Sequence, residues 1–185
     1  MQGDPDTAEL HFALGNLFRR RGDYDRAVRV HEHLLARADL NRKERDRAQH
    51  ALALDFLKAG LLDRAESALH KLEGTGFESE ARLALLGIYE RSRDWSQAQA
   101  IAEKLDAVEH GSFTTRIAHY QCEQAELAHR QGDAARTREL LDEVVRRAPG
   151  MARGWIARSA LRAQQGDVTG ALDDLLSLAQ QAPQG

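Results

Sequence analysis

Apolar residues recur along this chain with the three- and four-residue spacing of amphipathic helices, and the apolar segments come in pairs. The first pair reads ALGNLFRRRGDYDRAVRVHEHLL, and the same frame returns four more times. No segment shows the period-two alternation of a half-buried strand. The turns that separate the paired helices centre on Gly22, Gly60, Gly132 and Gly166, with Asp94-Trp95 in the place of a fifth. The pattern predicts an all-α chain of about five helix hairpins.

Successive turns lie 38, 33, 39 and 34 residues apart when Arg93 is taken as the third turn position. These spacings cluster about the 34-residue period of the tetratricopeptide repeat, whose hairpins stack into a right-handed α-solenoid. We therefore expect one repeat domain over residues 1–185. Its units are expected at about 8–38, 46–74, 79–109, 115–150 and 152–183.

Start and stop signals agree with this frame. A glycine just past a helix can take the left-handed conformation that ends it, and an aspartate after the glycine can cap the next helix. The pairs are Gly22-Asp23, Gly132-Asp133 and Gly166-Asp167. Capping-box spacing joins Asp6 to Glu9, Asn41 to Glu44 and Asp94 to Gln97. Three prolines, Pro5, Pro149 and Pro183, fall outside the predicted helices.

Small residues repeat at matching positions of the paired helices and should let the two backbones approach closely. They are Gly15, Ala53, Ala125 and Ser159 in the first helices, and Ala27, Ala65, Ala98 and Ala171 in the second.

Composition narrows the function classes. The net charge is −3 with both signs interspersed, whereas nucleic-acid binders carry a basic surface, so no nucleic-acid partner is expected. The single cysteine permits no intrachain disulfide, which favours a reducing compartment. No apolar run approaches the roughly 20 residues of a membrane span, and no signal peptide opens the chain. We expect a cytoplasmic chain that does not itself insert into a membrane.

Candidate chemistry is sparse. His119, Cys122, Glu126 and His129 share one helix face and are metal-ligand types. The outer pair is about 15 Å apart along a helix, too far for all four to reach one ion. A nucleophile elbow, a phosphate-binding glycine loop and paired CxxC motifs are all missing from the sequence. Neither an enzyme nor a metal or other cofactor is expected in these residues, although a metal-dependent enzyme fragment stays an alternative.

The first helices of stacked hairpins line the inner curve, so their residues between the packing positions predict a partner-binding groove. An extended or helical protein segment would suit it, with Phe12 or Leu83 as anchors and the arginines selecting acidic groups. Asn16 matches a carboxylate-clamp position of some co-chaperones, but Phe12 replaces the leading Lys, so that clamp is not expected. The predicted groove residues are Phe12, Asn16, Arg19, Arg20, His50, Leu54, Lys58, Leu83, Glu90, Arg91, His119, Glu126 and Arg130, and Arg153, Ile156 and Gln164 continue the inner curve.

The strings LALDFLKAGLLDRAESAL, LLGIYERSRDWSQAQAIAEKL and RIAHYQCEQA resemble the cytoplasmic repeat region of the lipopolysaccharide assembly protein B family. The likeness runs from about residue 8 to residue 183. It implies a non-enzymatic adaptor in the regulation of lipopolysaccharide biosynthesis, with a membrane AAA protease and its client, the LpxC deacetylase, as partners. It also implies an N-terminal anchor to the inner membrane, and a C-terminal rubredoxin-like domain holding iron or zinc, neither of which is in these residues. The alternative is a generic peptide-binding scaffold for another complex.

The last predicted helix is rich in leucine, and no polar helix follows it to cover its open face. We expect either that the natural protein continues beyond Gly185 or that this end packs on another copy.

Overall fold

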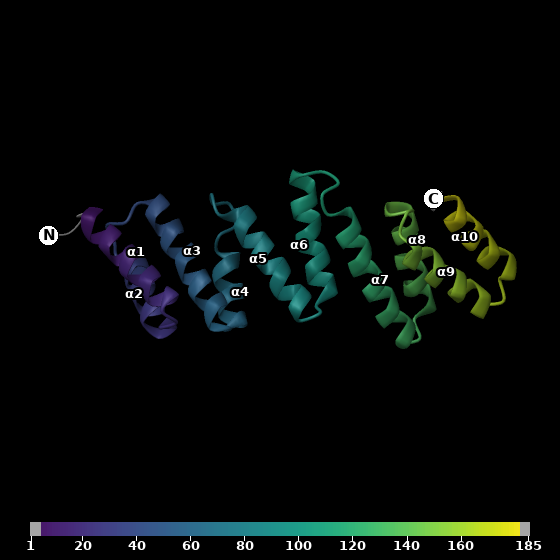
Figure 1. The fold of residues 1–185 in the computed structure, drawn as a ribbon, viewed down its shortest axis with the longest axis horizontal. Helices are drawn as coiled ribbons and strands as arrows, with labels where there is room; N and C mark the ends of the chain where they lie inside the picture. Colours follow the sequence, from purple (N-terminus) through teal and green to yellow (C-terminus); the bar gives the residue numbers. More distant parts are fainter. Residues whose placement is uncertain (1–4, 182–185) are drawn as a thin grey trace. The chain divides into compact units, whose positions relative to one another are not determined.

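In the computed structural model, residues 5–181 are described, and they form ten α-helices with no β-strand among them (Figure 1). The predicted all-α class of helix hairpins is confirmed. The helices are α1 (Pro5–Arg20), α2 (Tyr24–Ala36), α3 (Arg42–Ala59), α4 (Leu62–His70), α5 (Glu78–Arg91), α6 (Trp95–Val108), α7 (Thr114–Arg130), α8 (Ala134–Arg147), α9 (Ala152–Gln164) and α10 (Val168–Gln181).

The chain divides into two compact units, Met1–Ile88 and Tyr89–Gly185, and the division falls within α5. In the first unit α1 packs on α2, α2 on α3, and α3 on α4. In the second, α6 packs on α7, α7 on α8, α8 on α9, and α9 on α10. Within α1–α4 and within α6–α10, each helix thus packs on the helix that follows it, as in a repeat array. The single domain expected over residues 1–185, with its five unit bounds, stays a prediction.

The turns within the hairpins have the predicted chemistry. Gly22, Gly60, Gly132 and Gly166 have φ angles of 81°, 77°, 76° and 86°, the left-handed conformation that glycine adopts without strain. Arg93 takes the same place before α6, with φ 57°. After each of these five residues, the next amide donates to a carbonyl five residues earlier, for example Asp94 N to Tyr89 O at 2.9 Å. These bonds close the carbonyl end of the preceding helix.

Most of the predicted caps are confirmed. The carboxylates of Asp23, Asp133 and Asp167 accept from the amides of Arg26, Arg136 and Gly170 at 3.3, 3.0 and 2.9 Å. Asn41 and Glu44 form a complete capping box, and Asp94 accepts from the Gln97 amide.

The expected start of the first helix is wrong. Helix α1 begins at Pro5, so Asp6 lies inside its first turn and Pro5 is not outside a helix. Proline suits a first helical position because its missing N–H has no partner there anyway. Pro149 lies between α8 and α9 as expected, whereas Pro183 is outside the described residues.

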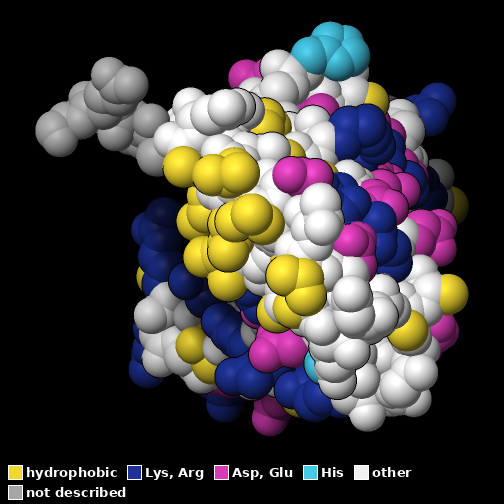
Figure 2. Space-filling model, turned by 90° about the vertical axis from the view of Figure 1, so that its right-hand side faces the viewer, with side chains coloured by type: hydrophobic (Ala, Val, Ile, Leu, Met, Phe, Trp, Pro, Cys, Tyr) yellow, Lys and Arg dark blue, Asp and Glu magenta, His cyan; other side chains and the backbone are white. Residues whose placement is uncertain are grey.

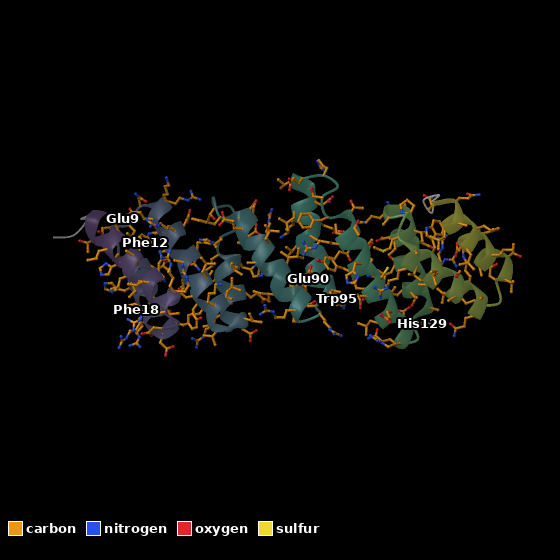
Figure 3. All side chains as sticks on the ribbon, viewed as in Figure 1. Glu9, Phe12, Phe18, Glu90, Trp95 and His129 are labelled. Atoms are coloured by element: carbon orange, nitrogen blue, oxygen red, sulfur yellow. The ribbon has the colours of Figure 1, made fainter. Side chains whose placement is uncertain are left out.

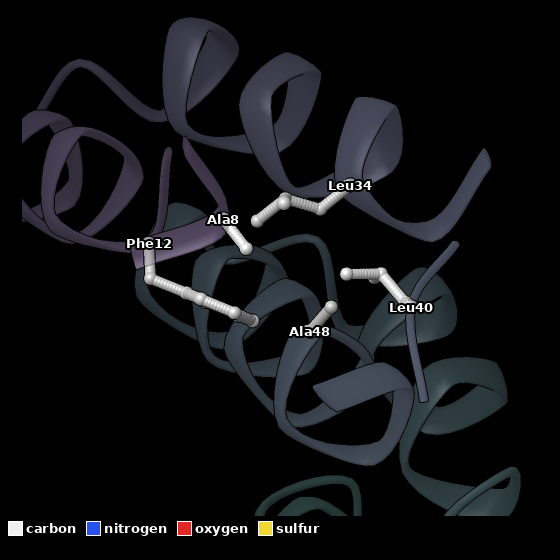
Figure 4. Packing of buried hydrophobic residues seen from close by; sticks show 5 residues of the cluster. All are labelled: Ala8, Phe12, Leu34, Leu40 and Ala48. Atoms are coloured by element: carbon white, nitrogen blue, oxygen red, sulfur yellow. The ribbon is translucent and has the colours of Figure 1, made fainter. Parts of the chain in front are cut away.

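Packing in both units uses the small residues that repeat in the sequence. The eight predicted small residues are all buried. In the first unit a cluster brings together α1, α2 and α3 and the loop that precedes α3 (Figure 4). Its members are Ala8, Phe12, Leu34, Leu40 and Ala48. In the second unit Ala125, Leu140, Leu141 and Leu161 join α7, α8 and α9.

Helix α10 keeps an apolar face open to solvent. Val168, Leu172, Leu175 and Leu176 are between 46% and 70% exposed, and their spacing places them on one side of the helix. Figure 2 looks at the end of the second unit that carries α10 and shows hydrophobic side chains gathered there. None of the helices within residues 5–181 combines the length and the apolar character needed to cross a membrane.

Candidate interaction surface

The residues predicted to line a groove are divided between the two units. In the first unit they lie on α1, α3 and α5, and in the second on the end of α5 and on α7. The first-unit set is Phe12, Asn16, Arg19, Arg20, His50, Leu54, Lys58 and Leu83, and the second-unit set is Glu90, Arg91, His119, Glu126 and Arg130.

Phe12 is a core residue, which corrects its prediction as a groove anchor. Its side chain is 1% exposed and belongs to the cluster of α1, α2 and α3. The Arg47 guanidinium lies over its ring at 4.0 Å and donates to Glu9 at 2.6 Å (Figure 3 labels Glu9 and Phe12). An anchor must be accessible to a partner's side chain. Because the ring is buried within the unit, Phe12 cannot act as one.

The Arg19 side chain is also hydrogen-bonded within the first unit, which corrects its prediction as a charge that selects a partner. It donates to the Asp55 carboxylate at 2.9 Å, to the Ala51 carbonyl at 3.1 Å and to the Asn16 side chain at 3.0 Å. The second oxygen of Asp55, a fully buried residue, is bonded to His31 Nδ1. Arg19, Asp55 and His31 thus link α1, α3 and α2 through one buried carboxylate, and Asn16 serves the same network.

The other first-unit residues lie nearer to solvent. His50 stacks on Phe77 with ring centroids 4.4 Å apart, and its Nε2 is 3.4 Å from a Glu80 oxygen. Burial lowers the pKa of His50 although Glu80 opposes the shift, so the ring is neutral near pH 7. Arg20, Lys58 and Leu83 are exposed, and Leu54 is half-buried.

In the second unit, Glu90 at the end of α5 is tied to α7. Its Oε1 accepts from Arg116 at 2.6 Å and from the hydroxyl of Tyr120. Burial alone would raise the pKa of Glu90, but these two hydrogen bonds outweigh it and the pKa is lowered. Burial and the bond to Glu90 raise the pKa of Tyr120 to about 12.

An aromatic group surrounds this carboxylate (Figure 3 labels Glu90 and Trp95). Trp95 stacks on Tyr120 with ring centroids 5.9 Å apart and meets His119 edge-on at 5.7 Å. These rings, together with Arg116 and Met151, line a shallow hollow of about 550 Å³. The hollow is wide and open, and its one carboxylate is already paired.

A smaller cleft lies among α7, α8 and α9. Its volume is about 270 Å³. Small side chains keep it open, and larger apolar ones form its floor. Glu126 and His129 lie along one side on α7, and Arg153 and Gln164 along the other on α9 (Figure 3 labels His129). The remaining lining residues are Cys122, Ala125, Thr137, Leu141, Ala157, Ala160 and Leu161.

Arg153 organises the charges at one end of this cleft. Its guanidinium lies 2.9 Å from a Glu123 oxygen and 3.2 Å from a Glu126 oxygen, and it is 3.3 Å from His119 Nδ1. Of the predicted groove residues, the second unit therefore brings His119 and Glu126 together. Arg91 and Arg130 are exposed and do not line the cleft.

Cys122 lines the floor of the cleft as a buried thiol. Burial raises its pKa, which keeps the thiol protonated. Across residues 5–181, no three His, Cys, Asp or Glu side chains gather as a metal site would require.

Several lining residues escaped the sequence prediction. Ala157, Leu141 and Leu161 occupy ordinary packing positions, and nothing in the sequence distinguishes an alanine that packs from one that leaves space. Trp95 and Tyr120 carried a usable signal, because both are large aromatics at positions where most hairpins have smaller side chains. The other hairpins have Tyr24, Leu62, Ala134 and Val168 at the position of Trp95, and Leu10, Ala48, Ala81 and Gly154 at the position of Tyr120.

Comparison with known families decides what the repeats are. Models of the tetratricopeptide repeat match residues 10–47 and 122–185, together more than half of the chain. The chain belongs to the tetratricopeptide-repeat family.

Within this repeat family the chain is similar to proteins named lipopolysaccharide assembly protein B, which confirms the resemblance found in the sequence. It is 40% identical to the protein of Escherichia coli K12 over 134 residues, 72% of this chain and 34% of that protein. It is 30% identical to the protein of Haemophilus influenzae over 176 residues, 95% of this chain and 44% of that protein. The repeat chain thus spans less than half the length of these relatives.

Solved repeat structures resemble the chain more distantly. A crystal structure of MamA protein is 18% identical, with a TM-score of 0.49 over 96% of this chain and 93% of that one. The structure described as the TPR2AB-domain:pHSP90 complex of yeast Sti1 is 18% identical, with a TM-score of 0.49 over 97% of this chain and 79% of that one.

Proposed function

We propose that this chain is the repeat part of a non-enzymatic adaptor that acts in the regulation of lipopolysaccharide biosynthesis. The observation that carries the proposal is the 40% identity to lipopolysaccharide assembly protein B over 134 residues. That stretch is much longer than one repeat period, so it reports more than a shared hairpin frame. The tetratricopeptide family itself supports a role in holding other proteins.

The proposed mechanism needs no chemistry in the repeats. An adaptor that binds a protease and its client together raises the effective concentration of one for the other. The proposed partners are a membrane AAA protease, the LpxC deacetylase, or both. The full-length protein would be tethered to the inner membrane on its cytoplasmic side, and its iron or zinc would belong to a separate rubredoxin-like domain.

Two surfaces of the chain suit such docking. In the first unit the exposed cations Arg20 and Lys58 can meet acidic groups. In the second unit the cleft among α7, α8 and α9 offers an apolar floor with a polar rim. Arg19 has no part in this surface, because its guanidinium is held by Asp55.

The test is crosslinked co-purification of the full-length protein from its own cells, followed by mass spectrometry. We expect the deacetylase and the protease to be enriched with the wild-type bait. The double variant Arg20→Glu with Lys58→Glu should recover less of one partner, because it reverses the two exposed cations proposed for the first-unit surface. Arg146→Glu with Arg21→Glu carries the same charge change at other exposed positions and is the matched control.

Enrichment of an unrelated complex with the wild-type bait, and of neither expected protein, would replace the proposal with a generic repeat scaffold.

A further inference from the structure

We propose that the cleft among α7, α8 and α9 binds a segment of a partner protein in which a large aliphatic side chain stands next to a lysine or arginine. The inference rests on the proposed adaptor function and names the partner chemistry that one of its surfaces selects. It differs from the expectation drawn from the sequence, in which arginines of the groove select acidic groups.

The size and lining of the cleft favour a single apolar side chain. Its volume of about 270 Å³ falls below the usual range of about 300 to 1,000 Å³ for pockets that enclose a drug-sized ligand. Ala125 on α7 and Ala157 and Ala160 on α9 all line the cleft, and their short side chains leave the space open. Leu141 and Leu161 form an apolar floor. A side chain that is fully desolvated in such a depression can carry much of the binding energy of a protein interface.

The floor offers almost nothing to a polar group. The thiol of Cys122 is neutral because burial raises its pKa. The hydroxyl of Thr137 is already used, since it donates to the Asp133 carbonyl at 2.7 Å. A polar side chain inserted here would lose its water and find only a weakly polar thiol and the acceptor side of one hydroxyl. The anchor is therefore apolar.

The charge at the rim favours a cation beside that anchor. Arg153 is the one cation among the lining side chains, and it is shared between the carboxylates of Glu123 and Glu126. Two carboxylates and one guanidinium leave a local net charge of −1. Glu126 keeps more than half of its side chain exposed, so an oxygen remains open to a second cation. A carboxylate on the partner would instead meet the two glutamate carboxylates that lie beside Arg153.

The chain order of the lining residues places the two features side by side. Ala125 borders the apolar space, and Glu126, the next residue on α7, carries the partly exposed carboxylate. A partner segment that fills the space therefore brings its adjacent residue to Glu126. This spacing distinguishes a neighbouring apolar and basic pair from a segment in which the two are far apart.

The test uses two capped hexapeptides, Gly-Ser-Leu-Lys-Gly-Ser and Gly-Ser-Leu-Glu-Gly-Ser, titrated to millimolar concentration at low salt. Amide chemical shifts of the isotope-labelled chain report affinity and location. We expect the Leu-Lys peptide to bind about threefold to fivefold more tightly, as one partly exposed ion pair allows. Shifts should concentrate on the amides of Ala125, Glu126 and Ala157. A peptide with Ala in place of Leu should bind more weakly than the Leu-Lys peptide.

Matched variants separate the two contributions. Ala157→Leu fills the cleft and should abolish binding, whereas Ala163→Leu, at an exposed position of the same helix, should not. Glu126→Gln should reduce the preference for lysine to near unity, whereas Glu139→Gln, which also removes a paired exposed carboxylate, should keep it. The Glu126 comparison remains informative if Ala157→Leu disturbs packing.

Equal or tighter binding of the Leu-Glu peptide would overturn the inference, as would shifts centred on another surface or no binding of either peptide. These results would not touch the adaptor proposal, which co-purification tests separately. Peptide selectivity without recovery of the expected partners would leave the cleft as described and remove the role in lipopolysaccharide regulation.

Discussion

Asp55 joins the first three helices through one buried carboxylate. It is fully buried, and its carboxylate is bonded to Arg19 on α1 and to His31 on α2. Removing one member of a buried charged group leaves the other members without compensation. We expect Asp55→Asn to lower the free energy of unfolding by about 3 to 5 kcal/mol, measured by urea denaturation.

Asp63→Asn on α4 is the control for this substitution, because Asp63 is exposed and should change stability by less than about 0.5 kcal/mol. A loss below about 1 kcal/mol for Asp55→Asn would show that the network contributes little.

Gly15 marks a second constraint in the same place. A Cβ at this position would lie 2.4 Å from Nε2 of His31, and the His31 ring cannot move away because it is buried and held by Asp55. We expect Gly15→Ala to lower the free energy of unfolding by about 1 to 3 kcal/mol through overpacking. Thermal and urea unfolding both measure it.

Gly87 provides the matched comparison, since it also lies within a helix but has nothing within 4 Å of an added Cβ. Gly87→Ala should raise stability by about 0.5 to 1 kcal/mol, because alanine is the better helix former. The same sign for both substitutions would be inconsistent with close packing at Gly15.

Sequence patterns located these residues but not all of their roles. The small residue at Gly15 was predicted to allow close approach, and the buried site against His31 agrees. The pairing of Arg19 with Asp55 was not predictable, because the two are 36 residues apart and an acidic residue at position 55 has the same appearance as any surface carboxylate. Phe12 was wrongly predicted to line a groove for a related reason. Periodicity shows which residues share a helix face, but whether that face is buried depends on the helices that pack on it.

Among the elements, the turn between α5 and α6 is the one that departs from the others. Arg93 adopts φ 57° where four other hairpins have glycine. The left-handed conformation costs a non-glycine residue about 1 to 2 kcal/mol of conformational free energy. Part of this cost is offset because glycine loses more conformational entropy on folding. We expect Arg93→Gly to raise the free energy of unfolding by about 0.5 to 1 kcal/mol.

The reciprocal change tests the same physical reason. Gly132→Ala forces a Cβ into the left-handed conformation at an otherwise open position, so it should lower stability by about 1 kcal/mol. Destabilisation by Arg93→Gly would instead indicate that the arginine side chain makes a compensating contact.

The connection from α5 to α7 should depend on pH. The pKa of Tyr120 is raised from 10 to about 12, so its contribution is complete below about pH 10 and is lost as pH rises towards 12. The difference in unfolding free energy between wild type and Tyr120→Phe should therefore be constant from pH 7 to 9. Between about pH 10 and pH 12 it should shrink by on the order of 1 kcal/mol. Urea denaturation across this range measures the difference. A difference that does not change with pH would mean that the Tyr120 hydroxyl and Glu90 do not interact.

At the scale of the whole molecule, the five hairpins were predictable because their turns repeat. Gly-Asp pairs fix where one helix ends and the next begins. The number of residues between successive turns is enough to identify the repeat family. The cleft among α7, α8 and α9 was predictable only in part. The positions of Glu126, Arg153 and Gln164 follow from the helical register. The open volume does not, because it depends on the sizes of alanine and leucine side chains on three helices together.

The exposed leucines of α10 lead to an expectation for the protein in solution. Contiguous apolar surface promotes association, so the chain of residues 1–185 should self-associate as its concentration rises. Leu172→Glu with Leu176→Glu should lower the weight-average mass in sedimentation equilibrium without lowering stability, because both side chains are more than half exposed. Ala163→Glu with Gln165→Glu adds the same charge on α9 as a control. Equal masses for wild type and the leucine variant would locate any association elsewhere.

The shared carboxylate of Asp55 also sets the smallest piece of the first unit that can be produced by itself. A truncation that starts at α3 discards both Arg19 and His31, the partners of this carboxylate, and uncovers the face of α3 on which α1 and α2 pack. Shortened versions for binding studies should therefore be cut before α1 or after α4, and never between the first two hairpins.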